Sequence, residues 1–590
     1  MNIDSTLAQL SAAELVRRTT DVDQAYIFKH GLTQDSAYQS LLQKQRREIH
    51  REVAQAYEAL YGDRCLDEYA PILAQHYAQA GDQLKAFNYA ARAGEDAAHK
   101  FANAEASAYY LQAIQIARRM KTPPGSQPSL QDLYLKIGRV YELSDQFDQA
   151  LDMYGEMESV ARERGDRAME LASLIARATI YSIPNPHFDR EHSKILCAQA
   201  LELARAIGDE ASEAKILWNL LLAHSRLDMH YRDAVVYGEQ GIAIARKLNL
   251  REQLAYLLND ISLLYALNGN PELGVRYNLE SRPMWREQNN LPMLADNLGY
   301  AVMYHVLLGE YVQAIDESRE ALKTIHRIGN GWSEAVIDSW LSDAYRELGE
   351  IDQAIVTMQN AVRLAEHSIQ APLAYTRADL GWLYGDLGQL ARGLELAQHG
   401  YREGERIAPI LGIYTSAALA HLHVLTGDLV SAHATIDQAF RSMQSEERST
   451  LFDSALNVAQ VELSLAQKDY ARAIEICERS ITSLRTSRLR QHSPDLLYLK
   501  GLALMRRGIM DEAFACLRDA QDEAERSGSR WMLWRILAAL AEVEEQRDNR
   551  GEAKALRAQA RAHLDFIIAH TPGEFRESFL NTPSVMKLLG

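Results

Sequence analysis

Three histidines lie close together in the segment HLHVLTGDLVSAH, and imidazole nitrogens are common metal ligands. His421 and His423 are two residues apart on an expected helix, so their side chains face different directions. His423 also stands where other repeats of this chain carry a packing ring, as described below. We therefore predict no metal site.

Motifs for catalysis and nucleotide binding are missing from the sequence. A phosphate-binding loop needs GxxxxGK[ST], and the chain contains no Gly-Lys pair. The segment GNGWSEA places two glycines before a helix, but without a third glycine or a preceding strand it indicates a junction between repeats. Neither HExxH nor GxSxG occurs. We predict that the chain is not an enzyme and binds no cofactor.

With metal binding and catalysis not expected, binding of a protein or peptide partner is the remaining function to consider. In stacked helical hairpins, residues about three, six, ten and thirteen positions before the turn tend to point into the concave surface. Aromatic, methionine and charged side chains there suit an extended or helical peptide, although several of them could instead pack on a neighbouring repeat. The predicted partner-binding groove consists of Tyr256, Asn259, Asp296, Met303, Asp343, Arg346, Tyr375, Trp382, Tyr414 and His421.

The elements that would position this groove repeat with a period of about 40 residues, seen most clearly in blocks that start at Arg251, Leu291, Gly331 and Ala371. Each block has an aromatic ring or histidine four residues before a turn glycine and a small residue five after it. A glycine at the turn can take the left-handed conformation that ends a helix. The turn glycines are Gly269, Gly309, Gly349, Gly388 and Gly427; the small residues are Gly274, Ala314, Ala354, Gly393 and Ala432.

This ring–turn–small pattern resembles the tetratricopeptide repeat, although the period is longer than that family's usual ~34 residues. The resemblance covers residues 69–571 and is weaker across 168–208. Each hairpin would leave an apolar face open for the next hairpin to cover. We predict an all-α fold, a superhelical solenoid of helical hairpins.

Composition restricts the partners of the chain. Its 63 Lys and Arg residues against 80 Asp and Glu residues give a net charge of −17, which disfavours nucleic-acid binding by the whole chain. Four separated cysteines and no CxxC pair indicate reduced, mostly buried thiols. No apolar run long enough to span a membrane and no signal peptide are present, so we expect a soluble, cytoplasmic protein without membrane contact.

The N-terminal segment does not follow the repeat. The runs LAQLSAAELVRR and AYIFKH predict a helix and a short strand, and FKHGLTQDSAYQSLL begins another helix, an order that resembles the end of a winged helix. Together with RREIHREVAQAYEALYGD and the final GEFRESFLNTPSVMKLLG, this segment resembles STAND-type regulatory ATPases, among them bacterial proteins with adenylate/guanylate cyclase domains. The resemblance implies that His30 contacts a nucleotide phosphate, here held by another polypeptide; a structural histidine at a helix start is the alternative.

The resulting domain prediction divides the chain into a winged-helix-like cap (1–62), first repeats (63–122), a linker (123–129), the solenoid (130–571) and an amphipathic tail (572–590). We interpret the chain as a non-catalytic protein-interaction scaffold, the sensor and partner-binding arm of a bacterial STAND-type signalling system. Its partners would be a protein or peptide in the groove and a separate STAND NTPase. The alternatives are a transcription regulator of the maltose-activator type and a fragment of a multidomain ATPase or adenylate cyclase.

Overall fold

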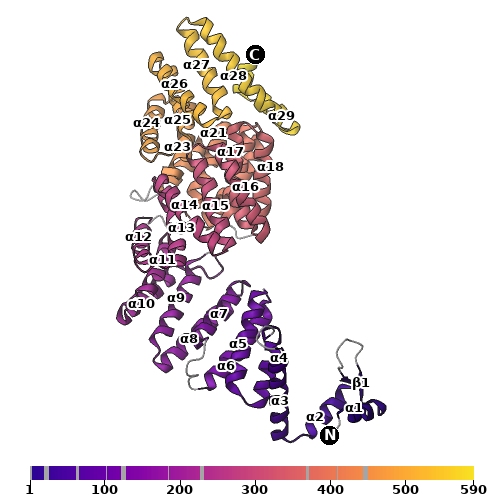
Figure 1. Ribbon diagram of the computed structural model, residues 1–590. Helices are drawn as coiled ribbons and strands as arrows, with labels where there is room; N and C mark the ends of the chain where they lie inside the picture. Colours follow the sequence, from indigo (N-terminus) through magenta and orange to yellow (C-terminus); the bar gives the residue numbers. More distant parts are fainter. Residues whose placement is uncertain are drawn as a thin grey trace. The chain divides into compact units, whose positions relative to one another are not determined.

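The computed structural model consists of α-helices and, among the described residues, one short pair of β-strands near the N-terminus (Figure 1). The chain divides into two units, Met1–Ile207 and Gly208–Gly590, each of which is described by itself. The prediction of an all-α solenoid is confirmed. The structure describes residues 3–18, 26–61, 66–100, 102–120, 128–183, 185–225, 231–366, 371–407, 409–442 and 450–590.

The first unit begins with an irregular segment and continues as helical hairpins. Its elements are α1 (Ile3–Ala12), β1 (Val16–Arg18), β2 (Tyr26–Phe28), α2 (Gly31–Ser40), α3 (Gln43–Tyr61), α4 (Leu66–Ala80), α5 (Gln83–His99), α6 (Asn103–Arg119), α7 (Leu130–Glu142), α8 (Phe147–Arg164), α9 (Arg167–Ser182) and α10 (Arg190–Ile207).

The second unit consists of helices throughout its described residues. They are α11 (Glu210–Ser225), α12 (Tyr231–Lys247), α13 (Arg251–Leu267), α14 (Pro271–Glu287), α15 (Leu291–Leu307), α16 (Tyr311–Ile328), α17 (Gly331–Leu348), α18 (Ile351–Ala365), α19 (Ala371–Asp386), α20 (Leu390–Ile407), α21 (Pro409–Leu425), α22 (Leu429–Ser442), α23 (Thr450–Ala466), α24 (Tyr470–Thr486), α25 (Ser493–Arg506), α26 (Met510–Ser527), α27 (Arg530–Gln546), α28 (Arg550–Ala569), α29 (Gly573–Leu580) and α30 (Pro583–Leu589).

The N-terminal segment has the predicted order of helix, short β-structure and helix. Strands β1 and β2 pair antiparallel, with Val16 opposite Phe28 and Arg18 opposite Tyr26. Helix α2 buries none of its residues. This segment therefore contributes little to a hydrophobic core, in contrast to the hairpins that follow it.

The hairpins have the geometry that the repeat pattern predicts. The small residues Ala314, Ala354 and Ala432 are fully buried where the second helix of a hairpin crosses the first. At Gly274 the approach is closer still, because a Cβ there would lie 2.6 Å from the Ser262 carbonyl oxygen. Small side chains at this position thus allow the two helices to pack with their backbones nearly in contact.

The C-terminal hairpins of the second unit pack back on its earlier hairpins. The Arg490 backbone N–H donates to the Leu307 carbonyl (2.9 Å), and Ser578 Oγ donates to the Leu387 carbonyl (2.8 Å). Helices α17 and α27 are in direct contact as well. One hydrophobic core runs through both sets of hairpins, in which the Tyr384 and Phe575 rings lie 5.1 Å apart. The solenoid therefore closes on its own inner surface.

This closure predicts unequal effects of alanine at two turn glycines. Gly388 and Gly427 have the same left-handed backbone, with φ of 79° and 81°. A Cβ at Gly388 would lie 2.5 Å from the Ser578 carbonyl oxygen, whereas a Cβ at Gly427 meets nothing within 4 Å. We expect Gly427→Ala to lower the free energy of unfolding by about 1–2 kcal/mol, the cost of the left-handed conformation. Gly388→Ala should lower the free energy of unfolding by about 1–3 kcal/mol more, because the added Cβ is too close to Ser578. Urea unfolding of the two variants measures both losses. Equal losses would contradict the contact between hairpins.

Other sequence predictions fall partly outside the described residues. Cys197, Cys477 and Cys516 are free and buried, as expected, while Cys65 and most of the 123–129 linker lie outside the described part. The predicted tail forms α29 and α30, and both pack inward through buried apolar side chains: Phe575, Phe579 and Val585. The predicted domain boundaries stay predictions. The division after Ile207 separates two compact units of the chain and does not test those boundaries.

Candidate functional site

A small cavity lies inside the second unit, where α17, α19, α21 and α23 meet the segment before α25. Its volume is about 50 Å³, enough for a few water molecules. The walls combine aromatic rings with charged and amide side chains. The lining residues are Trp340, Asp343, Arg346, Asp379, Trp382, Tyr414, Ala417, Ala418, Ala455, Gln491 and His492.

The structure brings several predicted groove residues to this cavity. Asp343, Arg346, Trp382 and Tyr414 line it directly. Tyr375 and His421 lie in the layer behind the wall: the Tyr375 ring packs edge-on against Tyr414, and His421 stacks on Trp382 at 4.5 Å between ring centroids. The spacing rule therefore grouped residues that do lie together, from helices α17, α19 and α21.

The remaining groove residues lie elsewhere and pack between repeats. Asn259 is fully buried and donates to Asp296 Oδ2 at 2.9 Å, and Met303 is 5% exposed within the core. Tyr256 packs between the rings of Trp218 and Trp285. We predicted that Asn259, Met303 and His421 are exposed on an open groove, and for these three residues the prediction is wrong. Neighbouring repeats bury all three side chains, and His421 is only 4% exposed.

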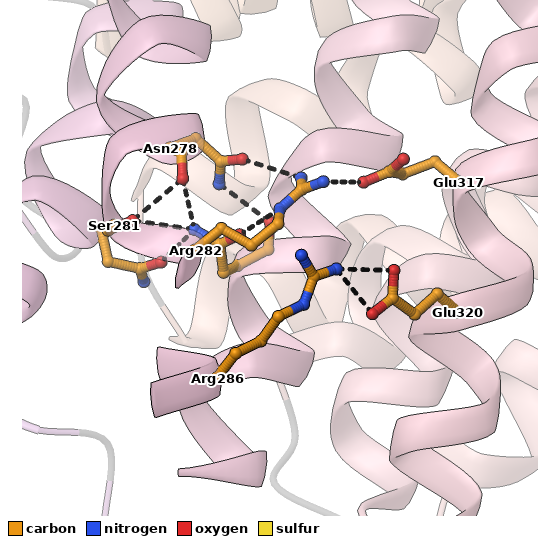
Figure 2. A network of polar contacts seen from close by, with 8 residues as sticks. Asn278, Ser281, Arg282, Arg286, Glu317 and Glu320 are labelled. Atoms are coloured by element: carbon orange, nitrogen blue, oxygen red, sulfur yellow. Dashed lines mark hydrogen bonds and ion pairs between the residues drawn. The ribbon is translucent and has the colours of Figure 1, made fainter. Parts of the chain in front are cut away.

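Asn259 belongs to a polar network between α13, α14, α15 and α16, most of which Figure 2 shows. Asn297 donates to the Asn259 side chain (3.1 Å) and to the Asn278 carbonyl (2.9 Å). Arg282 Nε donates to Asn297 Oδ1 (3.0 Å), and its Nη1 lies 2.5 Å from Glu317 Oε1. These contacts hold Asn259 and its partners inside the repeat stack, where neighbouring repeats cover them.

Two carboxyl groups at the cavity have environments that oppose ionisation. Burial raises the pKa of Asp343, and burial together with the charge of Asp343 raises that of Asp379 well above its usual range. Tyr414 Oη donates to Asp379 Oδ2 at 3.2 Å. Burial and the Arg346 charge lower the pKa of His492 to about 4, so this imidazole is neutral at pH 7. Arg346, which also lines the cavity, is therefore its charged group at pH 7, and the environment of the two carboxyl groups favours their neutral forms.

His421, behind the wall, has the opposite behaviour. Burial alone would lower its pKa, but Glu462 and Asp386 raise the pKa to about 10. The His421 Nδ1 atom lies 2.6 Å from Glu462 Oε2, and Nε2 lies 3.3 Å from Asp386 Oδ1, outside hydrogen-bonding geometry. The imidazolium in turn lowers the pKa of Asp386 despite burial. His421 is thus a buried cation held between two carboxylates.

Some residues that line the cavity are not among the groove residues that we predicted from the sequence. Trp340, Asp379 and Ala418 stand nine residues before the turn glycine of their own hairpins, a position that the spacing rule omitted. Their common position is the signal that would have found them. Gln491 and His492 carry no such signal, because they reach the cavity only through the contact between distant hairpins.

His30 and the metal prediction concern other parts of the chain. His30 is exposed at the start of α2, and its side chain makes no capping hydrogen bond. Nothing in its surroundings tests a role at a nucleotide. Among the described residues, no group of three or more His, Cys, Asp or Glu side chains is placed to hold a metal ion. No helix in the described part of the chain is both long and apolar enough to span a bilayer.

Comparison with known proteins supports the repeat type locally. A family model for the tetratricopeptide repeat matches residues 339–368, which take in most of the α17–α18 hairpin. Among solved structures, a chain of the APC/C hetero-tetramer Cut9–Hcn1 is similar over 94% of this chain and 97% of its own, with 13% identity and a TM-score of 0.46. Yeast Tom70 is similar over 78% and 98%, with 12% identity and a TM-score of 0.33. A search of curated protein sequences gave no match.

Proposed function

We propose that the chain is a non-catalytic protein-interaction scaffold, the sensor and partner-binding arm of a bacterial STAND-type signalling system. The observation that carries this proposal is the apolar surface of the N-terminal segment. Leu32, Leu42 and Leu60 are 82%, 71% and 76% exposed. Leu15, Ile27, Phe28 and Tyr38 of the same segment are exposed as well, and such a concentration of exposed apolar side chains suits a surface that binds another protein.

The energetics favour a docking role over a simple cap. Full burial of a leucine side chain contributes roughly 1.5–3 kcal/mol, so a partner covering this surface gains several kcal/mol before the costs of association. A cap would instead place these leucines against α4, yet α2 buries none of its residues. The partner that the resemblance suggests is a STAND-type NTPase, with His30 near its bound nucleotide.

The competing proposal, a DNA-binding regulator, receives less support from the basic residues nearby. Arg46 donates to the carbonyls of Leu41 (3.0 Å) and Gln39 (2.8 Å), and Lys44 lies 3.9 Å from Glu48. These cations are engaged within the segment, and the whole chain carries a charge of −17. Phosphate binding here would have to displace the intramolecular contacts.

The test is a binding measurement with a purified STAND-type NTPase from the same genome. We expect saturable binding to the full chain and at least a tenfold loss for the Leu32→Ser/Leu42→Ser double variant. Val430→Ser is the matched control, because Val430 is equally exposed (82%) but lies on α22 in the other unit. It should bind like the native chain.

Three results would count against the proposal. If the Leu32→Ser/Leu42→Ser variant binds like the native chain, the exposed leucines do not form the docking surface. Tight, strongly salt-dependent binding to DNA would favour the regulator. ATP hydrolysis by the purified chain would favour the enzyme fragment.

A further inference from the structure

We propose that the cavity inside the second unit is a binding site for a small organic cation, such as an ammonium or guanidinium group. This site is separate from the N-terminal docking surface, so the two proposals can fail independently.

The wall offers cation-binding chemistry from two kinds of group. Trp340, Trp382 and Tyr414 present aromatic rings, whose faces attract cations. Asp343 and Asp379 add carboxylates on the same wall. Aromatic rings and carboxylates together recognise organic ammonium and guanidinium groups, and a bound cation would favour the ionised form of the two carboxyl groups.

The carboxylates at the cavity are incompletely satisfied by the protein. The Asp343 carboxylate receives no hydrogen bond from the described residues, and Asp379 receives one, from Tyr414. Arg346, the neighbouring cation, is directed elsewhere: its Nη2 donates to Glu347 at 3.0 Å, and its Nη1 lies 3.9 Å from Asp386. A bound cation would supply the contacts that Asp343 lacks.

Further unsatisfied atoms at the same wall also indicate a polar ligand. Arg346 Nε and Gln491 Oε1 are both buried without a hydrogen-bond partner in the described structure. Buried polar atoms are usually paired, so orphaned ones that line a cavity suggest ordered water or a ligand there. Gln491 offers an acceptor, which suits the N–H groups of an ammonium or guanidinium cation, whereas the Arg346 Nε–H needs an acceptor such as ordered water.

The size and the ligand set favour an organic cation over a metal ion. The described residues contain no group of three or more His, Cys, Asp or Glu side chains suited to a metal. A volume of about 50 Å³ accommodates one head group. The cavity is also too small for an extended peptide.

The test titrates the full chain with methylammonium and methylguanidinium chloride, at constant ionic strength set with sodium chloride. Tryptophan fluorescence reports the site directly, because Trp340 and Trp382 line it. We expect a saturable fluorescence change and a raised Tm with at least one of these cations. Asp343→Asn/Asp379→Asn should weaken binding at least tenfold.

Asp338→Asn is the matched control. Asp338 is another buried carboxyl group of α17, and burial raises its pKa to about 6, but it does not line the cavity. This variant should bind like the native chain. If the double variant fails to fold, Asp343→Asn alone decides by the same criterion.

The proposal is overturned if neither cation gives a saturable change, which would leave a cavity filled by water only. It is also overturned if the Asp343 and Asp379 variants keep native affinity. Methylurea, the uncharged isostere of methylguanidinium, is the control probe, and binding of methylurea as tightly as of the cations would show that charge does not select the ligand.

Discussion

His421→Phe is expected to lower the free energy of unfolding of the second unit by about 3–5 kcal/mol near pH 6, the usual cost of removing one partner from a buried ion pair. The native imidazolium stacks on Trp382 and lies between Glu462 and Asp386. Phenylalanine can keep the stacking but removes the imidazolium from both carboxylates, so that Asp386 keeps only the more distant Arg346, at 3.9 Å. Urea unfolding followed by circular dichroism measures the loss.

The ion pairs of His421 also predict how the free energy of unfolding depends on pH. The pKa of His421 is about 10 in the folded protein and about 6.5 in an unfolded chain. A raised pKa contributes stability that is complete below pH 6.5 and is lost as the pH rises through 10. The difference in unfolding free energy between the native chain and His421→Phe should therefore shrink by more than half between pH 6.5 and pH 9.5.

His433→Phe provides the control within the same hairpin. Its side chain is 58% exposed and lies 3.2 Å from Asp437 on the surface of α22. A substitution there should change stability by no more than about 0.5 kcal/mol, with little dependence on pH. Equal effects of the two substitutions, or a His421 effect that is constant with pH, would rule out a buried imidazolium.

Arg282→Met is expected to cost about 3–5 kcal/mol of unfolding free energy, because it removes the cation at the centre of the network in Figure 2. Arg282 is 12% exposed and its partner Glu317 24%. The substitution leaves Glu317 without its cation. It also removes the hydrogen bonds that Arg282 donates to the side-chain oxygens of Asn297 and Asn278. Hydrogen exchange should show the loss of protection concentrated in α13–α16.

Arg286 lies one helical turn further along α14 and gives a matched comparison, also shown in Figure 2. It pairs with both oxygens of Glu320, at 2.7 and 2.9 Å, but each side chain is 49% exposed. Exposed pairs contribute about 0.2–1 kcal/mol, so Arg286→Met should cost about 1 kcal/mol or less. Similar losses for both arginines would show that burial does not set the value of these pairs.

The site could be predicted in part. Helical spacing before the turn glycines brought Asp343, Arg346, Trp382 and Tyr414 together, since residues on one helix face share a direction. The same spacing also selected Asn259 and Met303, which neighbouring repeats cover. Spacing gives the face on which a residue lies. It does not give the depth to which the next element buries that face.

The sequence by itself determined the hairpins of this protein. A ring, a turn glycine and a small residue act over about ten neighbouring residues, and local sterics suffice to form the turn and the close helix crossing. Only the tertiary structure decided that the inner surface is closed. That closure joins residues such as Leu387 and Ser578, 191 positions apart. Their meeting depends on small rotations accumulated over several repeats, which no local pattern encodes.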